Sequence, residues 1–471
     1  MTHLVACVDF GSTFTKAALV DTATGELVAT ASHRTTIDTD VLDGWDACLA
    51  RLVTTDPRAA DAEVLACSSA GGGLRIGVVG NEELVTAEAG RRVALSSGGR
   101  VVHVTSGGLG EDGLVALRAA GPDVVLLVGG TDGGNADVLL ECAARLAKDR
   151  WTLPVVVAGN VDAQPEIAAG FDASGTPYVL ADNVVPRIGV LEPGSARAAI
   201  REMFLRHVIG GKQLSARDSG PGSRGSFASM VRGPTPDVVL TAVELLAHGL
   251  REDRPGLGDV VVVDVGGATT DVHSVLELDP EDASLAREVV ATVPLTRTVE
   301  GDLGMRWSAI STVEAGLASG ILAEHEAEAL RAGAQVRRAR PAHLPEGRAD
   351  VAAEKRIATA AVTLALRRHA GRSQGVHDMN GRVVQRSGTD LRDVGLLIGS
   401  GGVLRHGDRE SVRQILFAAT GRTPGGWQLP RAPRVLVDHD YVLAAAGLLV
   451  ADHPEAAHRL LSRLVELRVA R

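Results

Sequence analysis

Short apolar runs that end at small or polar residues recur along the chain. Near the N-terminus, residues 5–9 and 17–21 each predict a strand, and a turn rich in Gly, Ser and Thr joins the two. A third strand is expected at 28–32, a short helix at 44–52 and a further strand at 64–68. This order predicts the first half of an open α/β domain.

The middle of the chain alternates between apolar runs and helical stretches. The runs that predict strands are residues 101–105, 124–128, 155–158 and 178–181. Residues 136–148 and 164–169 predict helices between them. Strand–helix alternation is typical of a parallel, doubly wound sheet. We therefore expect an inserted or extended α/β region at about 85–205.

A second strand pair, at residues 260–264 and 271–276, encloses another turn of small residues. Helices are expected at 241–250, 307–334, 349–369, 441–450 and 458–468, a strand at 395–398, and a Gly/Ser-rich loop at 219–229. These elements divide the chain into the start of a first lobe (1–84), the inserted region (85–205), connecting helices and a loop (206–258), and a second lobe (259–471).

The two hairpins are copies of one arrangement, VACVDFGSTFTKAALV at 5–20 and VVVVDVGGATTDVHSV at 260–275. Small residues let backbone N–H groups and hydroxyls approach a ligand closely, and such turns form concavities that suit phosphate. A strand-end Asp beside the turn can hold Mg²⁺, usually through water. Two facing copies would clamp a polyphosphate from both sides.

A third glycine motif, GLLIGSGGVLRHG, occupies residues 395–407. Its glycines follow a predicted strand and precede a helix that is expected to start near Val403. Glycines at such a point let a flat base and its ribose lie against the backbone. The order along the chain is therefore phosphate turn, phosphate turn, nucleoside turn.

These three motifs resemble those of the actin, heat-shock chaperone and sugar kinase superfamily. CVDFGSTFTK is similar to its first phosphate motif, VDVGGATTD to its second, and IGSGGVL to its adenosine motif. The resemblance implies duplicated actin-like (ribonuclease H-like) ATPase lobes with a nucleotide cleft, in addition to the doubly wound region. The alternative is three unrelated glycine-rich hairpins in an α/β protein.

The resemblance assigns roles to matching residues. Asp9 and Asp264 are expected to hold Mg²⁺ and water beside bound ATP. The expected phosphate contacts are Gly11, Ser12, Thr13, Thr15, Lys16, Gly266, Gly267, Thr269 and Thr270, and the expected adenosine contacts are Gly399, Ser400, Gly401 and Gly402. Thr15 and Lys16 could equally be a strand residue and a solvated side chain.

Five further residues have weaker assignments. Asp271 is more typical of a polar hairpin end than of a ligand. Glu300 and Arg306 could support the nucleotide or lobe closure, with helix capping slightly favoured for Glu300. His439 and Asp440 are expected to cap the C-terminal helix.

Five further segments indicate which family of this superfamily the chain resembles. They are LLVGGTDGGNADV, PVVVAGNVDAQ, VLADNVVPRIGVLEPGSARAAIREMF, RTVEGDLGMRWSA and DHDYVLAAAGLL. They resemble the MutL, or GlmL, proteins associated with adenosylcobalamin-dependent glutamate mutase, which are unrelated to the mismatch-repair protein of the same name. The resemblance implies an ATPase that maintains or reactivates a cobalamin-dependent aminomutase or carbon-skeleton mutase, with the mutase subunits as its partners.

The chain itself is not expected to be the mutase. Such mutases bind cobalamin through a DxHxxG loop, and HDMNG at 377–381 does not match that pattern. The predicted strand ends of the inserted region carry a further set of polar residues, Thr131, Asp132, Asn135, Asn160 and Asn183. Ligands bind beyond the carboxyl ends of strands in doubly wound sheets, so we hypothesise a second site there. Turn shaping and helix capping are the favoured alternative.

Charge and cysteine content exclude other classes. The net charge is −10 without a long basic run, so nucleic acid is an unexpected partner. No run of about 20 uncharged apolar residues predicts a membrane span, and nothing predicts disulfides, so a cytoplasmic location is expected. The scattered cysteines Cys7, Cys48, Cys67 and Cys142 predict no zinc or iron–sulfur site, which disfavours an ATP-driven reductase activator.

Two rival functions remain within the fold, a small-molecule kinase and an actin-like scaffold. A kinase needs a general base near the acceptor hydroxyl. Asp132 and Asp302 are candidates, and neither is singled out by its pattern. No sequence feature specifies an oligomeric state.

Overall fold

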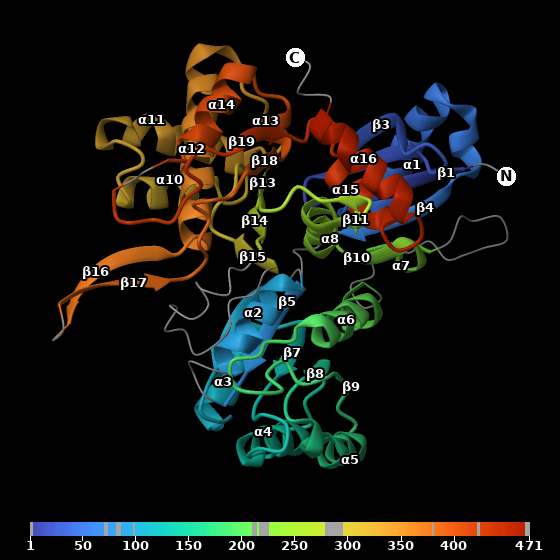
Figure 1. Ribbon diagram of the computed structural model, residues 1–471. Coiled ribbons are helices and arrows are strands. Elements are labelled where there is room, and N and C mark those ends of the chain that lie inside the picture. The colour runs from blue at the N-terminus through green and yellow to red at the C-terminus, as the bar shows by residue number, and fades with distance from the viewer. Residues whose placement is uncertain are drawn as a thin grey trace.

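The computed structural model describes residues 3–69, 74–81, 86–97, 99–209, 214–215, 226–277, 295–378, 381–421 and 424–466. Three five-stranded sheets lie within these residues. In Figure 1 the two lobes lie side by side, and the third sheet with its helices lies below them. Among the described residues, no helix combines the length and the apolar character that crossing a bilayer requires.

The first lobe is built on a mixed sheet with the order β10-β4-β1-β2-β3. Its strands are β1 (Leu4–Phe10), β2 (Phe14–Asp21), β3 (Glu26–Arg34), β4 (Glu63–Ser68) and β10 (Val231–Pro234). β1 pairs antiparallel with β2 and parallel with β4. Every residue of β1 is buried, which agrees with its continuous apolar run.

The second lobe repeats this topology with the order β15-β14-β13-β18-β19. Its strands are β13 (Val260–Val265), β14 (Thr270–Val275), β15 (Leu295–Glu300), β18 (Leu396–Ser400) and β19 (Arg434–Val437). The central strand again pairs antiparallel with its hairpin partner and parallel with the strand on its other side. The predicted duplication of the lobes is confirmed.

A shared apolar core joins the two lobes. Helices α8 (Thr235–His248) and α15 (Val442–Leu449) pack against each other, and α16 (Pro454–Glu466) packs on α15. Their side chains form one buried cluster with β1 and β4 of the first lobe and β13 of the second. The chain therefore crosses between the lobes twice, once through α8 and once just before α15.

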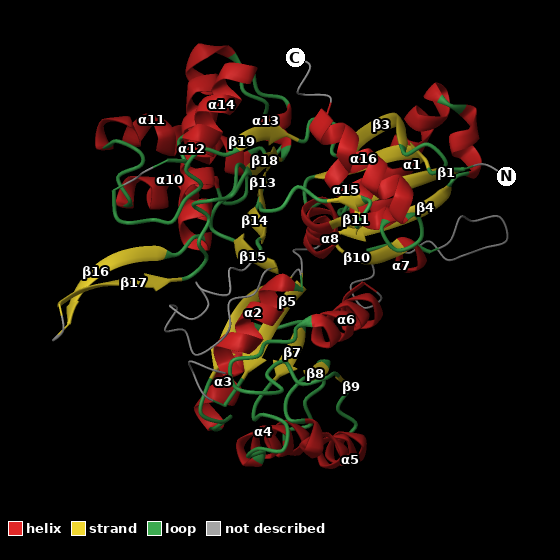
Figure 2. Cartoon of the chain, viewed as in Figure 1, coloured by secondary structure: helices red, strands yellow, loops and turns green. Residues whose placement is uncertain are grey.

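The helices of the second lobe cover the opposite face of its sheet. They are α10 (Ala309–Ala318), α11 (Ala327–Ala339), α12 (Gly347–His369), α13 (Gly402–Arg405) and α14 (Arg409–Phe417). The helical stretch expected at 307–334 is two helices, because Gly320 adopts a left-handed φ of 70° between them. The hairpin β16 (Arg372–Asp378) and β17 (Gly381–Ser387) was not expected, and Figure 2 shows that it projects from this lobe.

The third sheet is parallel throughout, with the order β6-β5-β7-β8-β9. Its strands are β5 (Leu74–Val79), β6 (Gly99–Thr105), β7 (Val124–Leu127), β8 (Val155–Val157) and β9 (Tyr178–Leu180). The accompanying helices are α2 (Glu88–Ser96), α3 (Glu111–Ala120), α4 (Asp137–Lys148), α5 (Gln164–Ser174) and α6 (Gly194–Met203). The predicted doubly wound region is confirmed.

This sheet includes a strand, β5, that the sequence analysis did not predict and whose residues it assigned to the first lobe. β5 lies before the boundary expected at residue 85 and pairs with both β6 and β7. Gly77 interrupts its short apolar run, which hid the strand. The remaining domain limits stay predictions, and most of the loop expected at 219–229 lies outside the described residues.

Candidate functional site

A cavity of about 1040 Å³ lies between the two lobes. Both glycine hairpins line it, together with the start of α8 and the residue that precedes α15. Residues of α12, α13 and α14 line it on the side of the second lobe. The cavity is therefore built where the duplicated sheets face each other.

The first hairpin closes through a tight turn. The N–H of Gly11 donates to the carbonyl of Phe14 over 3.2 Å, and a Cβ at Gly11 would lie 2.6 Å from that oxygen. Thr35 fixes the turn, since its hydroxyl donates to the Gly11 carbonyl over 2.7 Å. The Thr13 hydroxyl is buried without a hydrogen-bond partner among the described residues. An oxygen-rich ligand in the cavity would supply that partner.

The second hairpin has the same geometry. The N–H of Gly266 donates to the carbonyl of Thr269 over 2.9 Å. The carbonyl of Gly267 accepts from the backbone N–H groups of Arg306 and Trp307, which anchors the turn to the following segment. A Cβ at Gly267 would lie 2.8 Å from the Thr13 hydroxyl. The two turns thus approach each other across the cavity, one from each lobe.

Most of the expected ligand contacts line this cavity. They are Asp9, Gly11, Ser12, Thr13, Lys16, Asp264, Gly266, Gly267, Thr269, Gly401 and Gly402. Thr15, Thr270, Gly399 and Ser400 lie in the strands behind the lining. Alternate residues of a strand face opposite sides. Lys16 and Asp271 face the cavity, so their neighbours Thr15 and Thr270 point away from it. Thr15 instead meets the hydroxyl of Thr35 at 3.2 Å.

The Asp9 carboxylate is almost fully enclosed, with 3% of the residue exposed. The Thr235 hydroxyl donates to Oδ1 over 2.6 Å, and the Tyr441 hydroxyl donates to Oδ2 over 3.0 Å. Lys16 also donates to Oδ2 over 3.2 Å. Burial and the nearby carboxylates of Asp9 and Asp264 raise the pKa of Tyr441, so its phenol stays a donor. Sequence reasoning missed Thr235 and Tyr441, although Tyr441 lies inside the quoted DHDYVLAAAGLL.

Asp264 occupies the equivalent position in the second lobe but has different neighbours. Asp9 faces Lys16 across its hairpin, whereas Asp264 faces Asp271. Desolvation raises the pKa of Asp264 to about 6, the charge of Lys16 lowers it, and Asp271 and Asp9 raise it further. A cation bound beside Asp264 would favour its ionised form.

These residues fit Mg²⁺ held through water and phosphate oxygens. The described residues contain no group of three or more His, Cys, Asp or Glu placed to cage a metal ion. Mg²⁺ usually binds one or two carboxylates together with substrate phosphates and water. Asp9 and Asp264, one from each lobe, match that requirement, and the unpartnered Thr13 hydroxyl matches a phosphate beside them.

Asp271 positions the second turn from behind. It accepts from the Thr269 hydroxyl over 2.9 Å and pairs with Arg297 over 2.6 Å. Arg297 is 1% exposed, so the pair is shielded from solvent. The structure therefore gives Asp271 more than the role of a polar hairpin end, because it connects β15 to the turn residue Thr269.

Two expectations about capping are wrong. Glu300 ends β15 and forms an ion pair with Arg368 over 2.7 Å, so it caps no helix start. Asp438, rather than His439 or Asp440, caps α15, since its carboxylate accepts from the N–H groups of Val442 and Leu443. The sequence analysis named His439 and Asp440 and missed Asp438, because the backbone geometry decides which of these neighbouring side chains reaches the start of α15.

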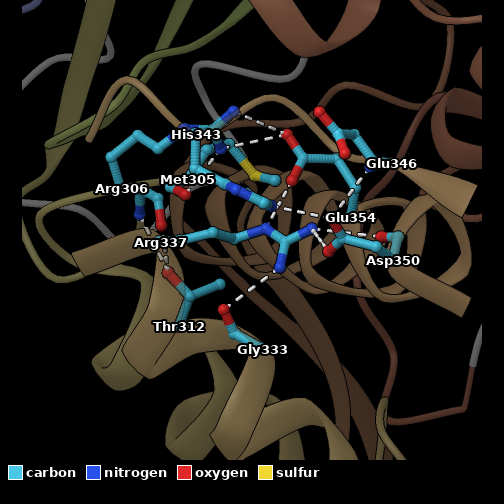
Figure 3. A network of polar contacts seen from close by, with 10 residues as sticks. Met305, Arg306, Thr312, Gly333, Arg337, His343, Glu346, Asp350 and Glu354 are labelled. Atoms are coloured by element: carbon cyan, nitrogen blue, oxygen red, sulfur yellow. Dashed lines mark hydrogen bonds and ion pairs between the residues drawn. The ribbon is translucent and has the colours of Figure 1, made fainter. Parts of the chain in front are cut away.

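Arg306 connects the second turn to a buried ionic network (Figure 3). Its backbone N–H binds Gly267, and its guanidinium donates twice to Glu354 over 3.0 Å. Arg337, which is fully buried, donates to Glu354 and to Asp350. His343 lies 2.7 Å from the other oxygen of Asp350. The pKa of Asp350 falls to about 2 in spite of burial, because the backbone N–H of Glu346 and the side chains of His343 and Arg337 donate to it.

The nucleoside turn lies at the other end of the cavity. Gly401 has a φ of 97°, and a Cβ there would lie 2.2 Å from the carbonyl of Val265. Only glycine fits this crossing of β13 and β18. Val351, Ser411, Val412 and Ile415 line the cavity beside it, from α12 and α14. A flat apolar group with a polar edge could lie between these two helices.

The polar residues of the third sheet brace its loops against one another. Asn183 donates to Asp132 over 2.8 Å and to the carbonyl of Gly130, and Asn160 donates to the carbonyl of Gly134 over 3.0 Å. Asn135 accepts from the N–H of Asp137 over 2.7 Å, at the start of α4. These contacts support turn shaping over the hypothesised second site.

The duplicated sheets, the cleft between them and the paired glycine turns define the chain as a protein of the actin-like ATPase fold. The chain belongs to the MutL protein family, whose model matches residues 5–465. Protein MutL of Clostridium tetanomorphum is 35% identical over 462 residues, which cover 97% of this chain and 98% of that protein.

Solved structures with a similar arrangement are distant in sequence. The activator of the 2-hydroxyisocaproyl-CoA dehydratase from Clostridium difficile, with bound ADPNP, is 9% identical, with 99% of this chain and 98% of that chain covered and a TM-score of 0.32. The ethanolamine utilization protein EutJ from Carboxydothermus hydrogenoformans is 11% identical. The match covers 97% of this chain and 90% of that chain, with a TM-score of 0.27.

Proposed function

We propose that the cleft binds ATP with Mg²⁺ and hydrolyses it. The observation that carries this proposal is the approach of two equivalent glycine turns, one from each lobe, with the unpartnered Thr13 hydroxyl between them. A triphosphate placed there meets backbone N–H groups from both sides. The nucleoside would extend toward Gly401, between α12 and α14.

Asp9 and Asp264 would hold the Mg²⁺, and Lys16 would neutralise phosphate charge. Bound Mg²⁺ would supply charge stabilisation to the phosphate oxygens. The residues of the chain position the phosphates and exclude bulk water, and in phosphoryl transfer positioning and charge stabilisation account for most of the catalysis. Asp271 would keep Thr269 oriented toward the ligand.

We further propose that the protein maintains or reactivates an adenosylcobalamin-dependent mutase of the glutamate mutase or aminomutase type. Membership of the MutL family supports this role, and so does the lack of a DxHxxG motif in the sequence. Releasing an inactive, buried cofactor requires an interface to open. Two lobes that the chain connects through α8 and through the segment before α15 can couple nucleotide binding to such an opening, provided that the two states bind the mutase differently.

The nucleotide step is tested with Asp264→Asn. We expect this variant to lose about 10²-fold in ATP turnover, because a carboxylate that would hold the Mg²⁺ beside the phosphates is replaced by a neutral amide. Phosphate release with Mg²⁺ and ATP measures the change. Asp253→Asn, at an exposed position outside the cavity, is the matched control and should behave as wild type. Equal turnover in the two variants would contradict the assignment.

A further inference from the structure

Tyr441 and Thr235 bind Asp9 from the two segments that connect the lobes. Thr235 is the first residue of α8, and Tyr441 immediately precedes α15. Their hydroxyls donate to different oxygens of the same carboxylate, over 2.6 and 3.0 Å. Both crossings of the chain between the lobes therefore end on the side chain that is expected to face Mg²⁺.

Tyr441 is held by both lobes at once. Its ring lies under Lys16 of β2, whose Nζ is 3.8 Å from the ring centroid. Arg405 of α13, in the second lobe, lies 5.1 Å from the same centroid. The backbone of Tyr441 is left-handed, with a φ of 59°, a conformation that residues other than glycine rarely adopt. This backbone and these contacts place the phenol hydroxyl on Asp9.

The surroundings of Asp9 in the first lobe differ from those of Asp264 in the second. In the second lobe, Asp271 stands where Lys16 stands in the first, and Asp264 is half-buried at the cavity wall. Asp9 already accepts from Thr235, Tyr441 and Lys16, and the Cys67 thiol lies 3.7 Å from its Oδ1, so these four donors fill the roughly four acceptor sites of the carboxylate. A water molecule bound to Mg²⁺ could reach Asp9 only by replacing one of these donors.

We propose that Tyr441 is a positioning residue that competes with Mg²⁺-bound water for Asp9, so that binding of Mg²⁺ and nucleotide is coupled to the position of the lobes. This inference rests on the proposed nucleotide function. Release of the Tyr441 hydroxyl removes the bond that ties the segment before α15 to Asp9, and binding therefore loosens one crossing between the lobes. By reciprocity, a partner that favours the loosened crossing would raise the affinity for Mg²⁺ and nucleotide.

Tyr441→Phe removes the competing donor and keeps the ring between Lys16 and Arg405. The chain contains two tyrosines, and Tyr178→Phe is the matched control because its hydroxyl bonds to Asp172 over 3.1 Å in the third sheet. ADP affinity is measured by calorimetry at increasing Mg²⁺ and again with chelator. We expect Tyr441→Phe to tighten binding about three- to tenfold with Mg²⁺ only.

Hydrogen exchange of residues 438–446 gives an independent readout. In wild type, exchange in this segment should quicken when Mg²⁺ and ADP bind. In Tyr441→Phe it should be fast from the outset and respond little to the ligand. Thr235→Val, which removes the other hydroxyl donor, should shift Mg²⁺-dependent binding in the same direction if Tyr441→Phe folds poorly.

The outcomes separate this inference from the proposed function. Wild type that binds no nucleotide at any Mg²⁺ concentration would overturn both. Wild type that binds, with Tyr441→Phe unchanged or weakened equally with and without Mg²⁺, would overturn only the competition. Tighter binding restricted to Mg²⁺, with Tyr178→Phe unchanged, would support it.

Discussion

His369 is a buried imidazole at the end of α12, and both of its ring nitrogens face hydroxyls. Nε2 lies 2.8 Å from Ser274 of β14, and Nδ1 lies 3.0 Å from Thr298 of β15. Burial lowers the pKa of His369 to about 3, so the ring stays neutral in the folded protein. One side chain thus joins the longest helix of the second lobe to two of its strands.

This neutral histidine makes the stability of the second lobe fall at acid pH. An unfolded histidine takes up a proton below about pH 6.5, whereas the folded one does so only near pH 3. The stabilisation is therefore complete above pH 6.5 and is lost as the pH falls toward 3. Between pH 7.5 and 5.5 this residue should account for about 1.4 kcal/mol of lost unfolding free energy.

Urea unfolding of His369→Gln at the two pH values measures this contribution. The variant should be less stable at pH 7.5 and should show a smaller loss between pH 7.5 and 5.5 than wild type. His325→Gln, at an exposed position, is the control and should keep the wild-type slope. An unchanged slope in His369→Gln would show that other groups cause the acid sensitivity.

Residues whose roles depend on local geometry were predictable, and those defined by distant partners were not. The glycines of both hairpins are required by turns only a few residues long, so their pattern is visible in the sequence. The partners of Asp9 are 226 and 432 positions away, at Thr235 and Tyr441. No spacing rule connects such positions, because the fold alone brings them together.

At the scale of elements, α11 and α12 are joined by the buried arginine of the network in Figure 3. Arg337 is fully buried and binds Glu354 and Asp350 of α12 over 2.5 and 2.7 Å. Removing Arg337 weakens the charge compensation of two carboxylates, which then keep only Arg306 and His343. The packing of these two helices, and through Arg306 the second turn, depends on this contact.

Arg337→Met should destabilise the protein by about 3 kcal/mol, because Glu354 and Asp350 lose their most buried counter-charge and keep only Arg306 and His343. Arg331→Met is the matched control on the same helix. Arg331 pairs with Glu314 at the surface over 2.7 Å, and its loss should cost about 1 kcal/mol or less. Thermal unfolding compares the two variants. Similar losses would mean that burial of the network contributes little.

Elements with a clear periodicity or a continuous apolar run were predicted well, and several interrupted or edge strands were missed. The hairpins around Asp9 and Asp264 and helix α12 lie where the pattern placed them. Edge strands β10 and β19 have four residues each, too few to establish a period. They gain their place by pairing with β4 and β18, which is a tertiary effect.

At the scale of the molecule, two equivalent sheets face each other and are joined at one place. That place contains Asp9, Thr235 and Tyr441, directly beside the cavity. A change of ligand at Asp9 therefore acts at the two segments that connect the lobes. The third sheet shares a buried cluster with the first lobe, and its helix α2 also packs on β15 of the second lobe.

Cobalamin release tests the central claim most directly. A candidate adenosylcobalamin-dependent mutase is loaded with cyanocobalamin, and this protein is added with Mg²⁺ and ATP. Release of cobalamin and of phosphate is followed together for wild type and for Asp264→Asn. We expect wild type to release cobalamin only when ATP is present. Asp264→Asn should lose both cobalamin release and phosphate formation. Steady phosphate formation without any cobalamin release would contradict the proposed role.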